Sequence, residues 1–198
     1  MGFSKIWVHG EATEAGVATI TLELLAKARE LADLVEVVMA GDGDAVASEL
    51  GEHGAITVHT IGALEGGLVG PRLASAIAET GTAVEGPDVL LSGTTYDGRD
   101  VAGRLSVKVD APVITNVVDL AVEGDRLIGQ EPVFGGTKDV STSFTSDGLA
   151  IFLVRPKSFP AEPTGGPAAS VVSMQVGCLL YTSPRPRDAT LARMPSSA

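Results

Sequence analysis

The feature that most constrains the fold is a repeated alternation between short aliphatic runs and longer segments with helical spacing. Such runs are typical of strands that are buried on both faces, as in a parallel sheet. Helices that connect parallel strands cross over with right-handed geometry and cover both faces of the sheet. We therefore expect an α/β fold with a mostly parallel, twisted sheet. The expected strands are residues 3–9, 34–40, 55–60, 88–92 and 113–118, and the expected helices are residues 17–33, 44–52, 71–79 and 97–109.

Local signals set the expected ends of the helices. Asp44 is expected to cap the second helix, and Pro71 is expected to open the third because its fixed φ suits the first helical turn. Asp97 is expected to be the N-cap of the fourth helix, with Asp100 stabilising the same end of the helix dipole. Pro112 cannot continue that helix, which must therefore end before it.

The pattern changes after the fifth expected strand, where strands no longer alternate with helices. Residues 119–122 and 126–134 flank a turn that contains glycine, which indicates a hairpin. Residues 140–145 alternate in polarity, and residues 149–154 form a last apolar run. We expect an antiparallel hairpin extension, residues 126–154, at one edge of the sheet.

The carboxyl-terminal part differs in composition from the rest of the chain. We expect one domain over residues 1–158, followed by a linker over residues 159–173 that is rich in Pro, Gly and Thr. Residues 174–198 have no usable hydrophobic period, so we expect them to be disordered and, because the change is abrupt, to be a non-native tail.

Composition excludes several classes of function. The net charge is −11, which repels a phosphate backbone and argues against nucleic-acid binding. The one cysteine gives no disulfide framework, and the three histidines lack metal-ligand spacing, so no metal site is expected. No apolar run approaches the roughly 18 residues that cross a membrane, and no signal peptide is evident. We expect a cytoplasmic protein without membrane insertion.

The loop at residues 92–99 is the strongest candidate for a binding site. It follows a central strand, where open α/β sheets place their ligands, and it offers hydroxyls, glycine amides and a guanidinium to an anion. The alternative, which we favour, is a helix-capping loop whose arginine pairs with a neighbouring carboxylate, because Asp97 and Asp100 offset the positive helix end. The candidate anion-binding residues are Gly93, Thr94, Thr95 and Arg99.

The remaining polar residues do not suggest catalysis. Glu11 and Glu14 could be imagined as an acid and a base, but they lie in a loop that is expected to be solvated, where pKa values stay ordinary. His9 and His59 each end a strand and are expected to be satisfied by local hydrogen bonds. We therefore expect that the chain has no catalytic residue and is not an enzyme.

Four stretches in a fixed order resemble the amino-terminal domain of electron transfer flavoprotein alpha subunits. The first has a strand, a loop and a Leu-rich helix, and the second has a strand, a small-hydroxyl loop, a Gly-Arg-Asp helix and Ala-Pro-Val. The third is rich in glycine and hydroxyl residues, and the fourth contains Val-Arg-Pro. These stretches are residues 6–32, 87–120, 131–144 and 152–161.

This resemblance implies an adenine-nucleotide-binding-like fold that serves as a scaffold and subunit interface. It also implies a heterodimer with a beta subunit that binds FAD and carries electrons from flavin dehydrogenases to an acceptor. In that family the flavin-binding residues of the alpha subunit lie mainly in a carboxyl-terminal domain, for which this sequence has no counterpart. We therefore expect an amino-terminal fragment that binds no FAD alone, with residues 126–154 contacting the beta subunit.

A second hypothesis stays open from the sequence. The chain could be a stand-alone adenine-nucleotide-binding module without redox activity, holding phosphate with the loop from Gly93 to Arg99. A small hydrolase or oxidoreductase is a weaker possibility, because no nucleophile and base are paired in the sequence.

Overall fold

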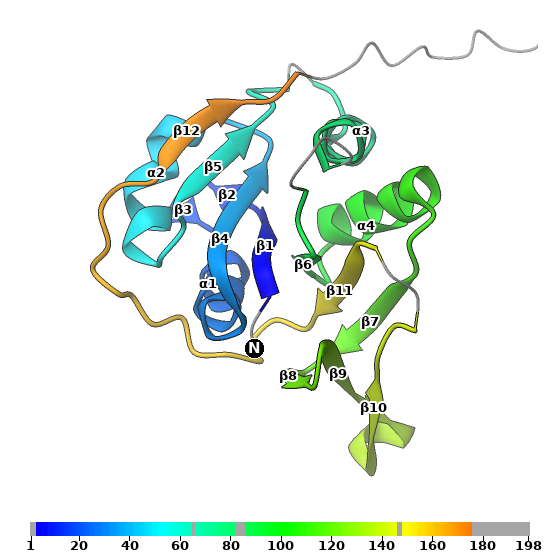
Figure 1. Ribbon diagram of the computed structural model, residues 1–198. Helices are drawn as coiled ribbons and strands as arrows, with labels where there is room; N and C mark the ends of the chain where they lie inside the picture. Colours follow the sequence, from blue (N-terminus) through cyan, green and yellow to red (C-terminus); the bar gives the residue numbers. More distant parts are fainter. Residues whose placement is uncertain (1–2, 65, 82–85, 146–147, 176–198) are drawn as a thin grey trace, which may run out of the picture.

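A seven-stranded parallel sheet forms the centre of the molecule (Figure 1). The computed structural model describes residues 3–64, 66–81, 86–145 and 148–175. The strand order is β12-β5-β4-β1-β6-β11-β7, with β12 at one edge and β7 at the other. The strands are β1 (Phe3–Gly10), β4 (Ala32–Met39), β5 (Thr57–Thr60), β6 (Val89–Gly93), β7 (Val113–Val117), β11 (Ala150–Val154) and β12 (Ser170–Ser173).

Helices cover both faces of this sheet, which confirms the expected α/β fold. Helices α1 (Thr19–Leu31) and α2 (Gly43–Glu52) lie on one face, and α3 (Val69–Gly81) and α4 (Tyr96–Val109) lie on the other. The aliphatic side chains of the strands alternate between two buried clusters, one beneath each helical layer. Strands that are buried on both faces need apolar residues at every position, which explains the uninterrupted runs in the sequence.

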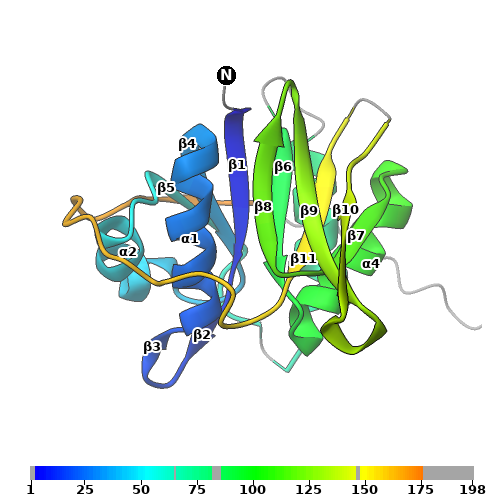
Figure 2. The same cartoon turned by 90° about the horizontal axis from the view of Figure 1, so that it is seen from below.

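A separate three-stranded antiparallel sheet takes the place of a helix on the α1 face (Figure 2). It consists of β8 (Asp119–Glu123), β9 (Arg126–Val133) and β10 (Lys138–Thr142), with a short 3-10 turn, Phe134–Gly136, between the last two strands. Leu120 and Leu127 point from it into the same core as α1. Gly129 lies so close to the main sheet that a Cβ atom there would be 3.1 Å from the ring of Phe152. The expected hairpin extension is thus confirmed for β8, β9 and β10.

The last apolar run is not part of that extension, and its predicted place was wrong. Strand β11 leaves the hairpin, enters the main sheet and pairs in parallel with both β6 and β7. Residues 151–154 are buried, and a short apolar run without alternation is typical of a central parallel strand rather than of an exposed hairpin. Because residues 149–154 follow the hairpin strands directly in sequence, we expected them to extend the hairpin. Their apolar side chains are instead buried in the main sheet.

The segment expected to be a linker, residues 159–173, ends in a strand. Before β12 the chain runs across α1 and α2, where Glu162 O accepts a 3.0 Å hydrogen bond from Arg29 and Thr164 N donates a 2.8 Å hydrogen bond to Glu52 O. Strand β12 then pairs in parallel with β5. Met174 follows it and is buried, while the rest of the predicted tail, residues 176–198, lies outside the described residues.

A two-stranded hairpin, β2 (Ala12–Thr13) and β3 (Gly16–Val17), joins β1 to α1. Over the part of the chain that the structure describes, no helix has both the length and the apolar character needed to cross a membrane. The same described residues contain no group of three or more His, Cys, Asp or Glu side chains arranged as a metal site.

Candidate functional site

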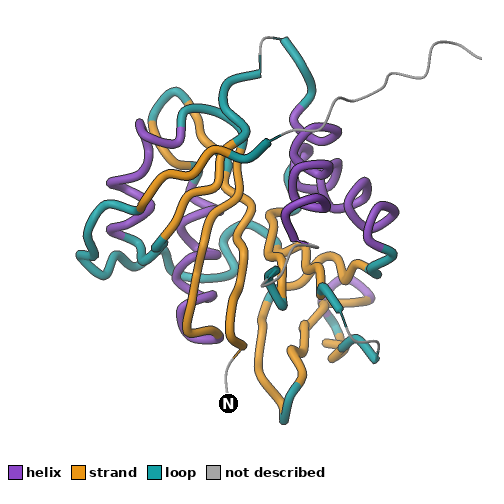
Figure 3. The backbone as a smooth tube through the Cα atoms, turned by 45° about the horizontal axis from the view of Figure 1, so that its top comes forward, coloured by secondary structure: helices purple, strands orange, loops and turns teal. Residues whose placement is uncertain are grey.

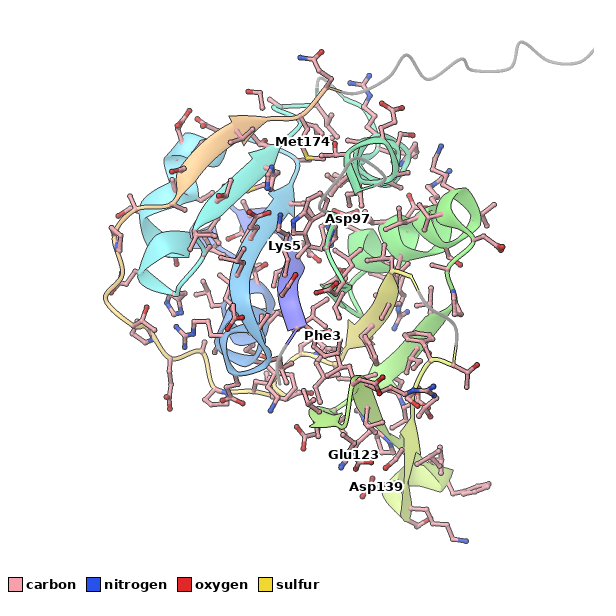
Figure 4. All side chains as sticks on the ribbon, viewed as in Figure 1. Phe3, Lys5, Asp97, Glu123, Asp139 and Met174 are labelled. Atoms are coloured by element: carbon pink, nitrogen blue, oxygen red, sulfur yellow. The ribbon has the colours of Figure 1, made fainter. Side chains whose placement is uncertain are left out.

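The candidate loop lies at the carboxyl ends of the central parallel strands, where several loops gather at one end of the sheet (Figure 3). Strand β6 ends at Gly93, and α4 begins at Tyr96. Figure 4 shows Asp97 near this end and Phe3, the first residue of β1, toward the opposite end. Open α/β sheets place their ligands at the end where this loop lies.

Thr95, rather than Asp97, is the N-cap of α4, so the predicted cap was wrong by two residues. The Thr95 hydroxyl accepts a 2.9 Å hydrogen bond from Gly98 N and donates a 2.5 Å hydrogen bond to Glu11 Oε1. Asp97 lies in the first turn, where its charge is favourable for the helix dipole. The same kind of correction applies to α2, whose N-cap is Asp42 and not Asp44.

Beneath Thr95, a buried histidine closes the β1 side of the loop. His9 Nδ1 lies 2.9 Å from Ser92 Oγ, and the His9 side chain is 1% exposed. Burial lowers the pKa of His9 from 6.5 to about 4, because desolvation disfavours the imidazolium. His9 is therefore uncharged at neutral pH, and its 3.8 Å approach to Glu11 Oε1 is not an ion pair under those conditions.

Glu11 is part of this arrangement, so the expectation that it is a solvated surface charge was wrong. Burial raises the pKa of the Glu11 carboxyl, the hydrogen bond from Thr95 lowers it, and the charge of Asp97 raises it further. Glu14 is exposed, as expected for a surface charge. The carboxylate of Glu11 thus joins the end of β1 to the start of α4.

A glycine lets α4 approach β6 closely. A Cβ atom at Gly98 would lie 2.1 Å from Gly93 O and 2.6 Å from Ser92 Oγ. Backbone cannot yield at such distances, so the helix could not start at this place with a larger residue. The glycine in the Gly-Arg-Asp segment therefore has a structural role.

The opposite side of the loop is open. A cavity of about 290 Å³ lies between α4, β7 and β11, and it is lined by Thr94, Arg99, Thr115, Asn116, Leu153 and Arg155. Of the four predicted anion-binding residues, Thr94 and Arg99 line this cavity, whereas Gly93 and Thr95 belong to the buried side. Among the described residues, no ion pair involves Arg99 or Arg155.

Backbone N–H groups of the loop are largely occupied. Thr94 N donates to Val154 O at 2.9 Å, Arg99 N donates to Thr95 O at 3.1 Å, and Gly98 N is bound by the Thr95 hydroxyl. These three groups are therefore not available as ligands of a phosphate.

A second polar cluster lies on β1, β4 and β5. Glu36 Oε2 accepts a 2.8 Å hydrogen bond from Trp7 Nε1 and lies 2.9 Å from His59 Nε2 and 3.9 Å from Lys5 Nζ. The hydrogen bond with His59 holds the pKa of the Glu36 carboxyl below its usual value. His9 and His59 are both hydrogen-bonded, as expected from their places at strand ends.

Sequence reasoning missed Glu11, Asn116 and Arg155 as neighbours of the loop. Glu11 and Thr95 are 84 residues apart in the sequence, and Arg155 joins the site only because β11 lies beside β6. The signal that could have found Arg155 is its place directly after a buried strand, since parallel strands end at the same edge of a sheet.

The parallel order of the sheet, its two helical layers and a loop at the strand ends define an open α/β domain of the class that places ligands at this edge. Residues 6–176 match the electron transfer flavoprotein domain. The chain therefore belongs to the electron transfer flavoprotein family.

Curated relatives agree with this assignment. The chain is 24% identical over 183 residues to the electron transfer flavoprotein subunit alpha of Bacillus subtilis and 27% identical over 178 residues to that of Mycobacterium tuberculosis H37Rv. It is 25% identical over 189 residues to protein FixB of Clostridium saccharobutylicum. The matches cover 87%, 87% and 88% of this chain and 54% of each relative. The chain thus spans about half the length of these relatives.

Proposed function

We propose that this chain is the amino-terminal part of the alpha subunit of a heterodimeric, FAD-containing electron carrier. The observation that carries the proposal is the family match over residues 6–176, together with relatives named as alpha subunits that are about twice as long. The electron donors would be flavin dehydrogenases, and an acceptor would receive the electrons from the complete carrier. In this role the chain is not a catalyst with its own substrate.

The domain would serve as a scaffold and as a surface for the beta subunit. We place the contact on the antiparallel sheet of β8, β9 and β10, the part of the predicted extension that remains after β11 is removed from it. Four of the five residues of β10 are exposed, and Phe134 at the tip of the hairpin is 79% exposed. Exposed apolar side chains on a projecting element are typical of an interaction surface, and aromatic residues often dominate such contacts.

The affinity of the Phe134→Asp variant for the beta subunit tests this interface. The Tyr96→Asp variant is the matched control. Both side chains are exposed aromatics, but Tyr96 is the first residue of α4 and does not belong to the small sheet. We expect Phe134→Asp to weaken binding by about tenfold or more, as for a central interface residue, and Tyr96→Asp to leave it unchanged. Equal binding by both variants and the unchanged protein, measured by calorimetry, would place the contact elsewhere.

The cofactor proposal has its own test. FAD would bind the complete heterodimer and not this fragment, because the family resemblance implies that the flavin-binding residues of alpha subunits lie mainly in a carboxyl-terminal domain, and this chain spans about half the length of its relatives. The purified chain is expected to show no flavin absorbance after incubation with FAD and gel filtration. Stoichiometric flavin in that experiment would contradict the fragment proposal without affecting the family assignment.

The stand-alone nucleotide-binding alternative makes the opposite prediction. It requires tight binding of ATP or AMP that Arg99→Ala abolishes. The occupied N–H groups of Thr94, Gly98 and Arg99 disfavour a phosphate cradle made of backbone. Calorimetric titration with both nucleotides and with inorganic phosphate tests this alternative, which requires that a nucleotide bind much more tightly than phosphate alone.

A further inference from the structure

We propose that the cavity between α4, β7 and β11 is a binding site for a phosphate group of a small molecule, held by Arg99 and Arg155. The proposal depends on the cavity and its cations, and not on the family role. Each arginine comes from a different element: Arg99 lies in the first part of α4, and Arg155 directly follows β11. Both line the same cavity of about 290 Å³.

The two guanidinium groups are free to bind an external anion. No ion pair to either of them is found among the described residues, although the chain has 25 Asp and Glu residues and only 14 Lys and Arg residues. The chain as a whole carries an excess of negative charge. Two arginines that line one cavity without an acidic partner therefore produce a positive potential there that contrasts with the rest of the surface.

The acids nearest in sequence to Arg99 form no ion pair with it among the described contacts. Asp97 lies in the first turn of α4, and no described hydrogen bond or ion pair joins its side chain to Arg99. Asp100 accepts a 2.7 Å hydrogen bond from Arg104 Nε. The expectation that Arg99 pairs with a neighbouring carboxylate therefore finds no support in the described contacts.

The remaining lining residues suit an oxyanion with several acceptors. Thr94 and Thr115 supply hydroxyl groups, and Asn116 supplies an amide, which makes only a 3.4 Å contact with Pro132 O. Leu153 supplies the apolar part of the lining. Two guanidinium groups match the double charge of a phosphate monoester, and their planar donors bind phosphate oxygens in pairs.

Titration with inorganic phosphate, followed by ³¹P NMR at constant ionic strength, tests the proposal on the complete chain. We expect saturable binding to one site. Arg99→Gln and Arg155→Gln should each weaken it by about tenfold or more, because each removes hydrogen bonds between charged groups. Lys108→Gln is the matched control, since it makes the same charge change at an exposed position of the same helix outside the cavity and should have no effect.

Three outcomes would overturn the proposal: no saturation, equal loss in Lys108→Gln, or displacement of phosphate by acetate at equal concentration. The last outcome would identify a carboxylate site, such as one for an acidic side chain of a partner protein. Circular dichroism checks that each variant is folded. Because both arginines are exposed, their replacement should leave the fold intact. If folding fails in a glutamine variant, Arg99→Lys and Arg155→Lys retain the charge but lose paired donors, and they should still weaken phosphate binding.

Discussion

The two sides of the loop between β6 and α4 differ in nearly every physical respect. On the β1 side, polar contacts between 2.5 and 3.8 Å long connect Ser92, His9, Glu11 and Thr95 in that order. On the β7 side, two arginines face a cavity without an acidic partner among the described residues. On the β1 side the polar groups bind one another, whereas on the β7 side hydrogen-bond donors remain available to an external ligand.

This difference teaches that one short motif can have two separate roles. Residues of the buried side, such as Gly98 and Thr95, place the helix against the strand. Residues of the open side, such as Thr94 and Arg99, contribute little to the packing of the core. A stability measurement should therefore respond to the first group, and a binding measurement to the second.

The largest effect is expected for Gly98→Ala. Its Cβ atom would meet Gly93 O at 2.1 Å, so helix and strand would have to move apart. We expect a loss of about 3 kcal/mol in the free energy of unfolding, at the upper end for overpacking, measured by urea denaturation. Gly103→Ala on the same helix is the control: nothing lies within 4 Å of its Cβ position, so it should gain about 0.5–1 kcal/mol from helix propensity. Equal effects would contradict the close approach of α4.

The second effect is a dependence of stability on pH that originates in His9. Its pKa falls from 6.5 in the unfolded chain to about 4 in the fold. Between these values the unfolded state binds a proton that the folded state does not, so stability decreases as pH falls through this window. The full loss is about 3 kcal/mol. Glu11, whose pKa is raised, acts with the opposite sign.

His9→Asn removes the titration and keeps a hydrogen-bonding group near Ser92. Unfolding measured at pH 7 and at pH 4 should show the variant losing less stability than the unchanged protein over this interval. The same pH slope in both proteins would mean that His9 is not the titrating group.

A smaller effect is expected for Thr95→Val. This substitution removes the N-cap of α4 and the hydrogen bond to Glu11 together. The loss in unfolding free energy should be about 1–2 kcal/mol, the usual range for an N-cap. Thr95→Ser keeps the hydroxyl and should recover most of the stability; if it does not, the methyl group rather than the cap is responsible.

The smallest change in stability is expected on the open side. Arg99→Gln and Arg155→Gln should alter the unfolding free energy by no more than about 0.5 kcal/mol, as for exposed residues without partners. A loss comparable with that of Thr95→Val would show that these arginines support the fold, and the contrast between the two sides would then not hold.

The alternation of strands and helices was readable because buried parallel strands and amphipathic helices leave periodic signals in the sequence. The place of β11 could not be predicted in this way. Residues 150–154 would be apolar both in a hairpin and in a central strand, and only the tertiary fold inserts them between β6 and β7. Strand β12 was missed for a related reason: its four residues follow a segment of proline and glycine that has no period.

The candidate site was predictable only in part. The loop itself follows from a strand that ends in glycine before a helix, so Thr94 and Arg99 could be named from the sequence. The residues that surround the loop could not be named from the sequence, because Glu11 and Arg155 come from segments that are distant in sequence and that the sheet order brings together. The N-cap was misplaced because Thr95 and Asp97 are both favourable cap residues, and a tertiary contact with Glu11 distinguishes them.

The position of β11 also determines the order in which the molecule can be completed. Among the strands of the described residues, β7 pairs with β11 alone, and β11 is synthesised after the whole antiparallel sheet. Until residues 150–154 have emerged, β7 has no neighbour in the main sheet and Thr94 N has no carbonyl of Val154 to bind. Such pairing between distant segments is slow because it requires closing a long stretch of chain. A nascent chain stalled before Ala150 would therefore expose an unpaired sheet edge, which can bind chaperones or pair with other chains and aggregate.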